Sequence, residues 1–495
     1  MDAALEKRLK RQVIGKTHRF LAIAPLGFEQ TLVREIEGIF SNDRQTTSKS
    51  IEPTERAPLS ERPHVSGDGK VEFTAKITDA WKAVAHSRIT NRILMQLADF
   101  KAENFRELEK KAAEIPWELY LAQKGVHIHV TCKHSRLYHS DAVAERLYKI
   151  LKGAGVGQKS QLLGSVMPAR KRSVATLALC SCPLAPADTA SATPSAGTPR
   201  NAPPQNIFVT LIDDRCTLWL DLAGEELYRR GHERFVNDAP LKETIAASMI
   251  FEAIEAAASS QSITLIDPMA GSGTFSLEAA YMANRLIPGI CRDFALKHQP
   301  AFKEATWNYI IKQQESVILS ATLSLSKCKR SASKDLTKII TSDISERAIE
   351  IIRHNVDCSP LAGIAPNENS PTITPQIRDL FSYTAKDIAD TCGETNPIIV
   401  LNPPYGKRLD FDAPKLYTKI GHHLATLASG LKQLGKSLTV AILAPKDDTR
   451  DGAKYTCTTN LLRECPALSP ENSSTAKCIA TSHGGFSLNV FIAKI

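Results

Sequence analysis

Strand-like apolar runs alternate with helical patterns along the C-terminal half of the chain, from residue 238 onward. Parallel strands need long crossover connections, usually helices, so this alternation predicts an α/β fold built on a doubly wound, mostly parallel sheet. Strands are expected at 262–266, 338–342, 374–378, 398–401 and 437–443, with helices at 239–257, 274–285, 346–357 and 415–431. The last residues differ, because 476–481 and 486–493 flank Gly484-Gly485 and predict a terminal antiparallel hairpin.

The N-terminal half is expected to be an α+β region interrupted by inserts. Two stretches, 41–66 and 157–205, are polar or rich in Pro, Ala and Ser, which is typical of inserts and linkers. The apolar spacing predicts one long helix over 79–99. Strands at 207–211 and 217–222 are expected to form a hairpin around Asp213-Asp214.

The net charge of +9 is unevenly distributed. Residues 121–180 contain 10 basic and 2 acidic side chains. Such a concentration is typical of a surface that contacts nucleic-acid phosphates, although a solvated basic face without a partner would have the same composition. The candidate RNA-binding residues within it are Lys133, Arg136, Arg170, Lys171 and Arg172.

Composition argues against several classes of protein. Hydrophobic residues make up 43% of the chain, yet no apolar run approaches the roughly 18 residues that cross a bilayer, and residues 1–16 contain no secretory apolar segment. The 11 cysteines include no CxxC pair. We therefore expect a cytoplasmic protein with reduced thiols, no metal site and no membrane partner.

A Gly-rich turn follows the first strand expected in the C-terminal half. Residues 267–274 read Asp-Pro-Met-Ala-Gly-Ser-Gly-Thr, in which Gly271 and Gly273 permit a tight turn and the close approach of a ligand. Neither a GxGxxG nor a P-loop pattern is present, which argues against a nicotinamide or nucleotide site. Asp343 and Asp379 end the next two strands, at the edge where doubly wound sheets bind ligands. Asp343 is expected to bind ribose hydroxyls, and Asp379 to lie near an adenine.

The fourth strand opens directly into the candidate catalytic residues, Asn402, Pro403, Pro404 and Tyr405. Two prolines cannot continue a strand, so a rigid turn fixes the Asn402 side chain and the Pro403 carbonyl as hydrogen-bond acceptors. An exocyclic amine on a base is a weak nucleophile, and two acceptors aimed at its N–H groups would favour a tetrahedral nitrogen that attacks a methyl donor. Tyr405 can stack on the base. The alternative is a turn that merely ends the strand.

These motifs resemble those of class I methyltransferases that act on base amino groups. Segments 220–225, 229–232 and 239–244 resemble the THUMP-containing RNA methyltransferases, and the nearest likeness is to 23S rRNA guanine-N2 methyltransferases of the RlmL type. The resemblance implies a ferredoxin-like region over 1–66, a THUMP RNA-binding domain over 67–230 and a Rossmann-like catalytic domain over 231–495. One departure is Lys407, which stands where these proteins usually carry an acidic residue.

The resemblance also implies a cofactor, a substrate and a set of contacts. The cofactor would be S-adenosyl-L-methionine, and the acceptor the N2 amine of a guanine in 23S rRNA or a large-subunit precursor. The alternatives are a tRNA guanine-N2 methyltransferase, a DNA adenine-N6 methyltransferase and a non-catalytic RNA-binding protein. The cofactor-binding residues would be Pro240, Asp267, Ala270, Gly271, Gly273, Thr274, Asp343, Asp379 and Asn402.

Overall fold

The computed structural model forms two compact units, each built from separate stretches of the chain. The larger unit comprises Lys10–Met95, Glu225–Arg292 and Lys303–Ile495, and the smaller unit comprises Met1–Leu9, Gln96–Gly224 and Asp293–Phe302. The residues that the structure describes are 3–41, 62–122, 125–156, 203, 205–236, 240–257, 262–312, 336–364, 371–405, 412–450 and 453–495.

The larger unit contains the expected α/β sheet, in the order β10-β9-β8-β11-β12-β16-β15. Its first five strands are parallel, and β16 runs antiparallel to both β12 and β15, so the doubly wound sheet and the terminal hairpin are confirmed. The carboxyl ends of the parallel strands meet at one edge. The strands are β8 Ile263–Asp267, β9 Leu336–Asp343, β10 Pro375–Ile377, β11 Asn396–Leu401, β12 Thr439–Pro445, β15 Lys477–His483 and β16 Phe486–Lys494.

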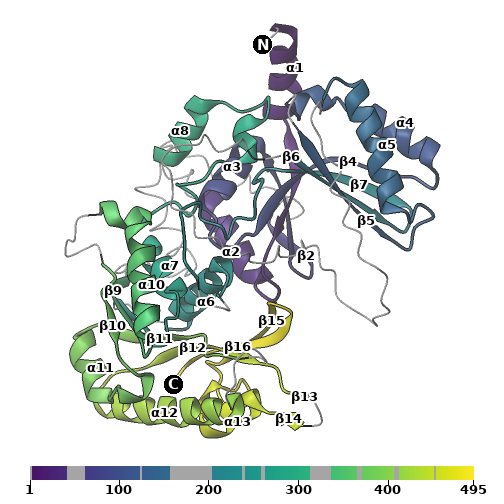
Figure 1. Cartoon of the computed structure of the whole chain (residues 1–495). Helices are drawn as coiled ribbons and strands as arrows, with labels where there is room; N and C mark the ends of the chain where they lie inside the picture. The colour runs from purple at the N-terminus through teal and green to yellow at the C-terminus, as the bar shows by residue number, and fades with distance from the viewer. Residues whose placement is uncertain are drawn as a thin grey trace, which may run out of the picture. The chain divides into compact units, whose positions relative to one another are not determined.

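Helices cover both faces of this sheet (Figure 1). One apolar core lies under α6 Glu243–Ala256 and α7 Thr274–Ala283, and another lies under α12 Ala413–Gln433 and α13 Cys457–Glu464. All residues of β11 and β12 are buried, as expected for central strands covered on both sides. The larger unit also contains α8 Glu304–Lys312, which contacts α3, and α10 Glu346–Asp357, α11 Ala385–Cys392, β13 Asp448–Arg450 and β14 Ala453–Tyr455.

The prediction of one long helix over 79–99 is wrong. The chain forms α3 Ile77–His86 and then strand β4 Arg92–Lys101. The break has a tertiary cause, because the buried carboxylate of Glu35 accepts hydrogen bonds from Ser87 Oγ at 2.5 Å and from the Arg88 backbone N–H at 2.7 Å. A buried carboxylate needs such partners, and satisfying it holds the turn after α3 in a non-helical conformation.

In the larger unit, the first residues of β4 complete an antiparallel arrangement of strands in the order β2-β3-β1-β4. Its core includes Phe20 and Phe73, whose rings stack with centroids 5.3 Å apart. The elements are β1 Thr17–Ile23, α2 Glu29–Ser41, β2 His64–Gly67 and β3 Lys70–Lys76.

The smaller unit orders its strands β4-β7-β6-β5. The hairpin expected around Asp213-Asp214 is confirmed, and both aspartates have positive φ angles, 51° and 61°, as a two-residue hairpin turn of this type requires. The elements are α1 Ala3–Leu9, α4 Phe105–Ala113, β5 Val126–Lys133, α5 Ser140–Gly153, β6 Gln205–Ile212 and β7 Arg215–Asp221.

Several expectations stay predictions. The ferredoxin-like and THUMP assignments, with boundaries at residues 66 and 230, have no direct counterpart in the two units. The inserts expected at 41–66 and 157–205 lie almost wholly outside the described residues. Among the helices that the structure describes, none combines the length and the apolar character needed to cross a membrane.

Candidate functional site

The Gly-rich turn joins the end of β8 to the start of α7. Gly271 and Gly273 have positive φ angles of 56° and 79°, and Gly273 caps the N-terminus of α7. A Cβ atom on Gly273 would lie 3.1 Å from Cγ1 of Ile352 in α10. Both the backbone conformation and the close approach of α10 therefore require glycine at position 273.

Asp267 lies inside the turn, with 1% of its surface exposed. Its Oδ2 accepts hydrogen bonds from the Ser276 hydroxyl at 2.8 Å and the Ser276 N–H at 3.2 Å, while Oδ1 is buried and has no partner among the described residues. Burial raises the pKa of Asp267 to about 7, against the opposing effect of Ser276. In this structure Asp267 holds the first turn of α7.

Asp343 joins the end of β9 to the same turn. Its Oδ2 accepts a hydrogen bond from the Gly271 N–H at 2.8 Å, and its Oδ1 accepts one from the Ser345 N–H at 2.9 Å. Each carboxylate oxygen still has acceptor capacity for ribose hydroxyls. The structure therefore brings Asp343 to the Gly-rich turn, as expected from the order of the strands.

Asp379 lies at the end of β10. Its Oδ1 accepts a hydrogen bond from the Phe381 N–H at 3.0 Å, and its side chain is exposed. The preceding residue, Arg378, donates its backbone N–H to the Asp343 carbonyl at 3.0 Å. Asp343 and Asp379 are thus on neighbouring strand ends, and the exposed carboxylate of Asp379 remains accessible to a ligand.

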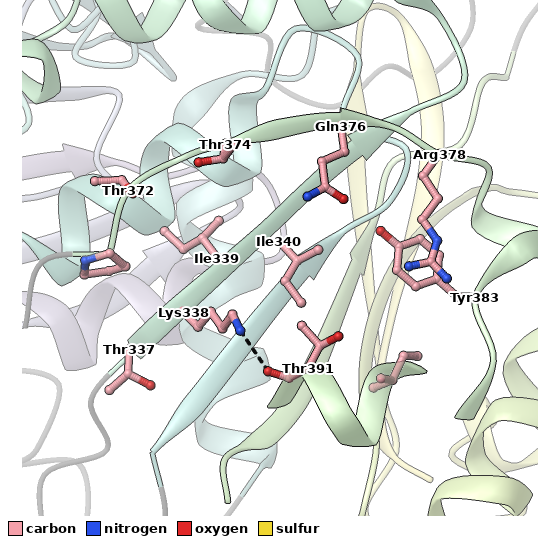
Figure 2. Close-up of a pocket in the computed structure, with 12 residues that line it drawn as sticks. Thr337, Lys338, Ile339, Ile340, Thr372, Thr374, Gln376, Arg378, Tyr383 and Thr391 are labelled. Atoms are coloured by element: carbon pink, nitrogen blue, oxygen red, sulfur yellow. Dashed lines mark hydrogen bonds between the residues drawn. The ribbon is translucent and has the colours of Figure 1, made fainter. Parts of the chain in front are cut away.

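A cavity of about 560 Å³ lies along the β9–β10 edge of the sheet (Figure 2). Its lining includes Gln376, Arg378 and Tyr383, and Lys338 Nζ donates a hydrogen bond to the Thr391 carbonyl at 2.9 Å beside it. The Arg378 guanidinium stacks on the Tyr383 ring at 3.7 Å. None of the expected cofactor or catalytic residues lines this cavity, so we do not assign it to the site.

The turn after β11 carries the expected acceptors. Asn402 Oδ1 is buried and has no hydrogen-bond partner among the described residues. An unpaired buried acceptor costs about 1–3 kcal/mol, which a bound donor would recover. Tyr405 packs edge-to-face on Phe486, with centroids 5.9 Å apart and an angle of 78° between the rings, and burial raises its pKa. Lys407 lies outside the described residues.

Two residues that the sequence did not single out hold the Gly-rich turn in place. The Arg234 guanidinium contacts the Glu243 carboxylate and the Thr274 hydroxyl. Asn355 in α10 donates its amide N–H groups to the carbonyls of Phe235 at 2.9 Å and Ser272 at 3.0 Å. Arg234 lies two residues after segment 229–232, which resembles the THUMP-containing RNA methyltransferases, so the sequence did indicate that its neighbourhood matters. The sequence contains no comparable indication for Asn355, because a polar residue within a helix is common.

Of the expected RNA-binding residues, the structure describes Lys133 and Arg136. Lys133 ends β5, and Arg136 is 68% exposed beside Glu103 and Asp214. The two carboxylates offset the charge of Arg136. Arg170, Lys171 and Arg172 lie outside the described residues.

One group of potential metal ligands occurs in the described chain. Atoms of Glu233, His354 and Cys358 lie within 4.8 Å of one another. The distance from Cys358 Sγ to His354 Nε2 is 3.5 Å, which a Cys–His hydrogen bond also explains, and the His354 ring stacks on Phe235 at 3.9 Å. These contacts explain the positions of His354 and Cys358 without an ion. The expectation of no metal site stays a prediction.

Comparisons with known proteins address the fold and the site. Residues 230–443 match the family model described as "RMKL-like, methyltransferase domain". The match covers 214 of the 495 residues, and this region is similar to methyltransferase domains of that kind. The matched region contains the Gly-rich turn, Asp343 and the Asn402 turn. The description names a methyltransferase, the class of protein for which the sequence predicts S-adenosylmethionine as the methyl donor.

Curated relatives extend the likeness beyond residues 230–443. The chain is 27% identical over 391 residues to a ribosomal RNA large subunit methyltransferase K/L of Allochromatium vinosum, covering 75% of this chain and 44% of the relative. It is 26% identical over 416 residues to the protein of the same name in Syntrophotalea carbinolica, covering 83% and 48%. The chain thus spans about half the length of these relatives.

The whole fold also has a solved counterpart. A putative methyltransferase complexed with SAH is similar with a TM-score of 0.61 and 20% identity, covering 97% of this chain and 98% of the other. At this identity the likeness concerns the fold, and it includes the N-terminal half as well as residues 230–443.

Proposed function

We propose that this protein transfers a methyl group from S-adenosylmethionine to the N2 amine of a guanine in RNA, with 23S rRNA or its precursor as the substrate. The observation that carries the proposal is Asn402 Oδ1 at the end of β11, which is buried and has no hydrogen-bond partner in the part of the chain that the structure describes. An acceptor in that position suits a donor N–H on the substrate. The proposed place of action is the cytoplasm.

The residues around the Gly-rich turn suit the cofactor. Gly271 and Gly273 leave the backbone open to a ligand, and Asp343 offers acceptor capacity for ribose hydroxyls. Asp379, exposed on the next strand end, would lie near the adenine. The cofactor supplies an electrophilic methyl group on a sulfonium. Asp267 would support the cofactor site indirectly, because its hydrogen bonds to Ser276 hold the first turn of α7.

The acceptor side would work by positioning. Asn402 Oδ1 and the Pro403 carbonyl would accept hydrogen bonds from the two N–H groups of the guanine amine, which turns its lone pair toward the methyl group. Tyr405 would stack on the base once it is extruded. No strongly basic side chain is needed, because the amine becomes acidic as the methyl group arrives and its proton can pass to water.

The substrate assignment rests on two supports of different kinds. The curated relatives carry a ribosomal RNA name, and residues 121–180 are strongly basic. A tRNA guanine would suit the same acceptors and is the second candidate. A DNA adenine is less well supported, because a DNA enzyme would carry a separate sequence-reading domain, whereas this chain has a basic region at 121–180 and segments that resemble THUMP-containing RNA methyltransferases.

The test begins with cells that lack the gene. Nucleosides from their 23S rRNA and tRNA are compared with wild type by mass spectrometry, and the RNA is then methylated in vitro by the purified chain. We expect N2-methylguanosine to be lost from 23S rRNA and restored by the chain, but not by Asn402→Ala. Loss from tRNA alone would transfer the proposal to tRNA, and unchanged RNA in both pools would refute it.

A further inference from the structure

The C-terminal hairpin ends in a tight turn beside the candidate site. His483 and Phe486 are the last paired residues of β15 and β16. Gly484 and Gly485 join them with positive φ angles of 58° and 83°, which suits a two-residue turn. This geometry holds the side chains of His483 and Phe486 at fixed positions on the same turn.

Phe486 contacts the acceptor side of the site. Its ring packs edge-to-face on Tyr405, and both rings lie against the core that includes Leu488 and Val490. Ser487, the next residue, accepts a hydrogen bond from the Lys446 N–H at 3.0 Å, which fixes the strand to the end of β12. The orientation of the Tyr405 ring is therefore set by a side chain that is 81 positions away in the chain.

His483 contacts the cofactor side of the site. Its Nε2 lies 2.8 Å from the Pro240 carbonyl, and because a carbonyl only accepts, Nε2 must donate. Pro240 shortly precedes α6, whose Glu243 binds Arg234, and Arg234 contacts Thr274 at the Gly-rich turn. The residues on either side of this hairpin turn thus contact both Pro240, near the Gly-rich turn, and Tyr405, which is proposed to stack on the base.

We propose that Phe486 is a positioning residue for the acceptor base, acting through Tyr405, and that His483 ties the same hairpin turn to the cofactor side. The hairpin turn then sets the spacing between the methyl donor and the base. The inference rests on the proposed function, because it takes Tyr405 as the residue that meets the base.

The first test compares Phe486→Ala and Phe486→Leu with wild type, using large-subunit ribosomal RNA from cells that lack the gene. An edge-to-face pair implies that Phe486→Ala raises KM for RNA by about 3- to 10-fold, with Phe486→Leu between it and wild type. The Kd for S-adenosylmethionine, from calorimetry, should not change. Cys478→Ala is the matched control, because it lies on the same hairpin with an exposed side chain. An unchanged KM in Phe486→Ala would overturn the proposal.

A double-mutant cycle tests whether Phe486 acts through Tyr405. Single-turnover rates are measured for Tyr405→Leu, Phe486→Ala and the double variant, each with cooperative unfolding as a check of the fold. We expect Phe486→Ala to have no further effect in the Tyr405→Leu background. Fully additive losses would overturn the coupling. If wild type itself methylates no RNA, the proposed function fails instead.

A third comparison tests His483. His483→Gln keeps a donor near the Nε2 position, whereas His483→Ala removes it. We expect His483→Ala to raise the Kd for S-adenosylmethionine several-fold and His483→Gln to restore it. Equal affinity in wild type and His483→Ala would overturn the proposed link to the cofactor side.

Discussion

Arg230 and Glu278 form a bidentate ion pair in the interior of the larger unit. Arg230 Nε lies 2.8 Å from Glu278 Oε1, and Nη2 lies 2.9 Å from Oε2. The side chains are 2% and 1% exposed. Arg88 is also buried, and its Nη1 lies 3.9 Å from Glu278 Oε2. Glu278 is one turn beyond Thr274 in α7, so the pair fixes the helix that follows the Gly-rich turn.

Glu278→Ala should strongly destabilise the protein. The change removes the carboxylate that pairs with the buried Arg230 and lies near the buried Arg88, and breaking a buried pair in this way costs about 3–5 kcal/mol. Urea unfolding followed by circular dichroism measures the change. Arg463→Gln is the control, because Arg463 is exposed and its pair with the partly buried Glu464 should contribute less than about 1 kcal/mol. Equal effects of the two substitutions would contradict the prediction.

Asn402→Ala should reduce methyl transfer while leaving cofactor binding nearly intact. Removing one fixed polar group that acts in the transition state typically lowers kcat by about 100- to 1,000-fold. Single-turnover rates and calorimetry with S-adenosylmethionine separate the two effects. A variant that keeps wild-type turnover would remove Asn402 from the reaction.

Asp343→Ala should weaken S-adenosylmethionine binding by about 10-fold or more, since hydrogen bonds to a charged group contribute about 1.5–3 kcal/mol. The loss would come from the ribose contacts and from the Gly271 N–H, which would lose its partner. Calorimetry gives the Kd. Asp357→Ala, at the exposed end of α10, is the control, and equal affinities in both variants would dismiss the assignment.

Asp267 should make stability depend on pH. Its folded-state pKa of about 7 lies above the ordinary value of 3.8, so the folded protein binds a proton that the unfolded chain has released between these values. Stability should therefore fall as pH rises through this window, by up to about 1.4 kcal/mol per pH unit. Urea unfolding at several pH values should show a smaller slope for Asp267→Asn than for wild type. Identical slopes would refute the shift.

Lys133→Gln should weaken RNA binding and its dependence on salt. Each phosphate contact that is lost lowers the slope of log K against log salt by about 0.7–0.9. Arg136→Gln should have a smaller effect, because Glu103 and Asp214 already offset its charge. Arg347→Gln, exposed on α10, is the control. Filter binding at several salt concentrations measures the slopes, and an unaltered slope in Lys133→Gln would place this residue away from RNA.

Most of the α/β sheet could be predicted, because its strands are continuous apolar runs. β11 and β12 are buried along their whole length and contain the expected strands at 398–401 and most of 437–443. The helix expected at 346–357 coincides with α10, whose start is fixed locally by Ser345, which accepts a hydrogen bond from the Ala348 N–H. Local signals were sufficient for these elements.

The failures have tertiary causes. The helical pattern over 79–99 stops at His86 because the turn after it binds Glu35, which is 52 positions from Ser87. The order of the strands was enough to predict that Asp343 lies at the Gly-rich turn. It could not predict the contact of Asn355 with Ser272, because the two residues are 83 positions apart. Contacts at such separations leave no periodic trace in the sequence.

The interleaved path of the chain decides how this protein can be divided for experiments. A fragment that starts at residue 231 would lose Phe28 from the core beside α6 and both arginines that neutralise Glu278. Residues 231–495 should therefore not be expressed as a separate fragment. An exchange of segments between relatives should instead have its junctions inside Gln96–Gly224. This stretch belongs to the smaller unit and includes none of Phe28, Arg88 and Arg230.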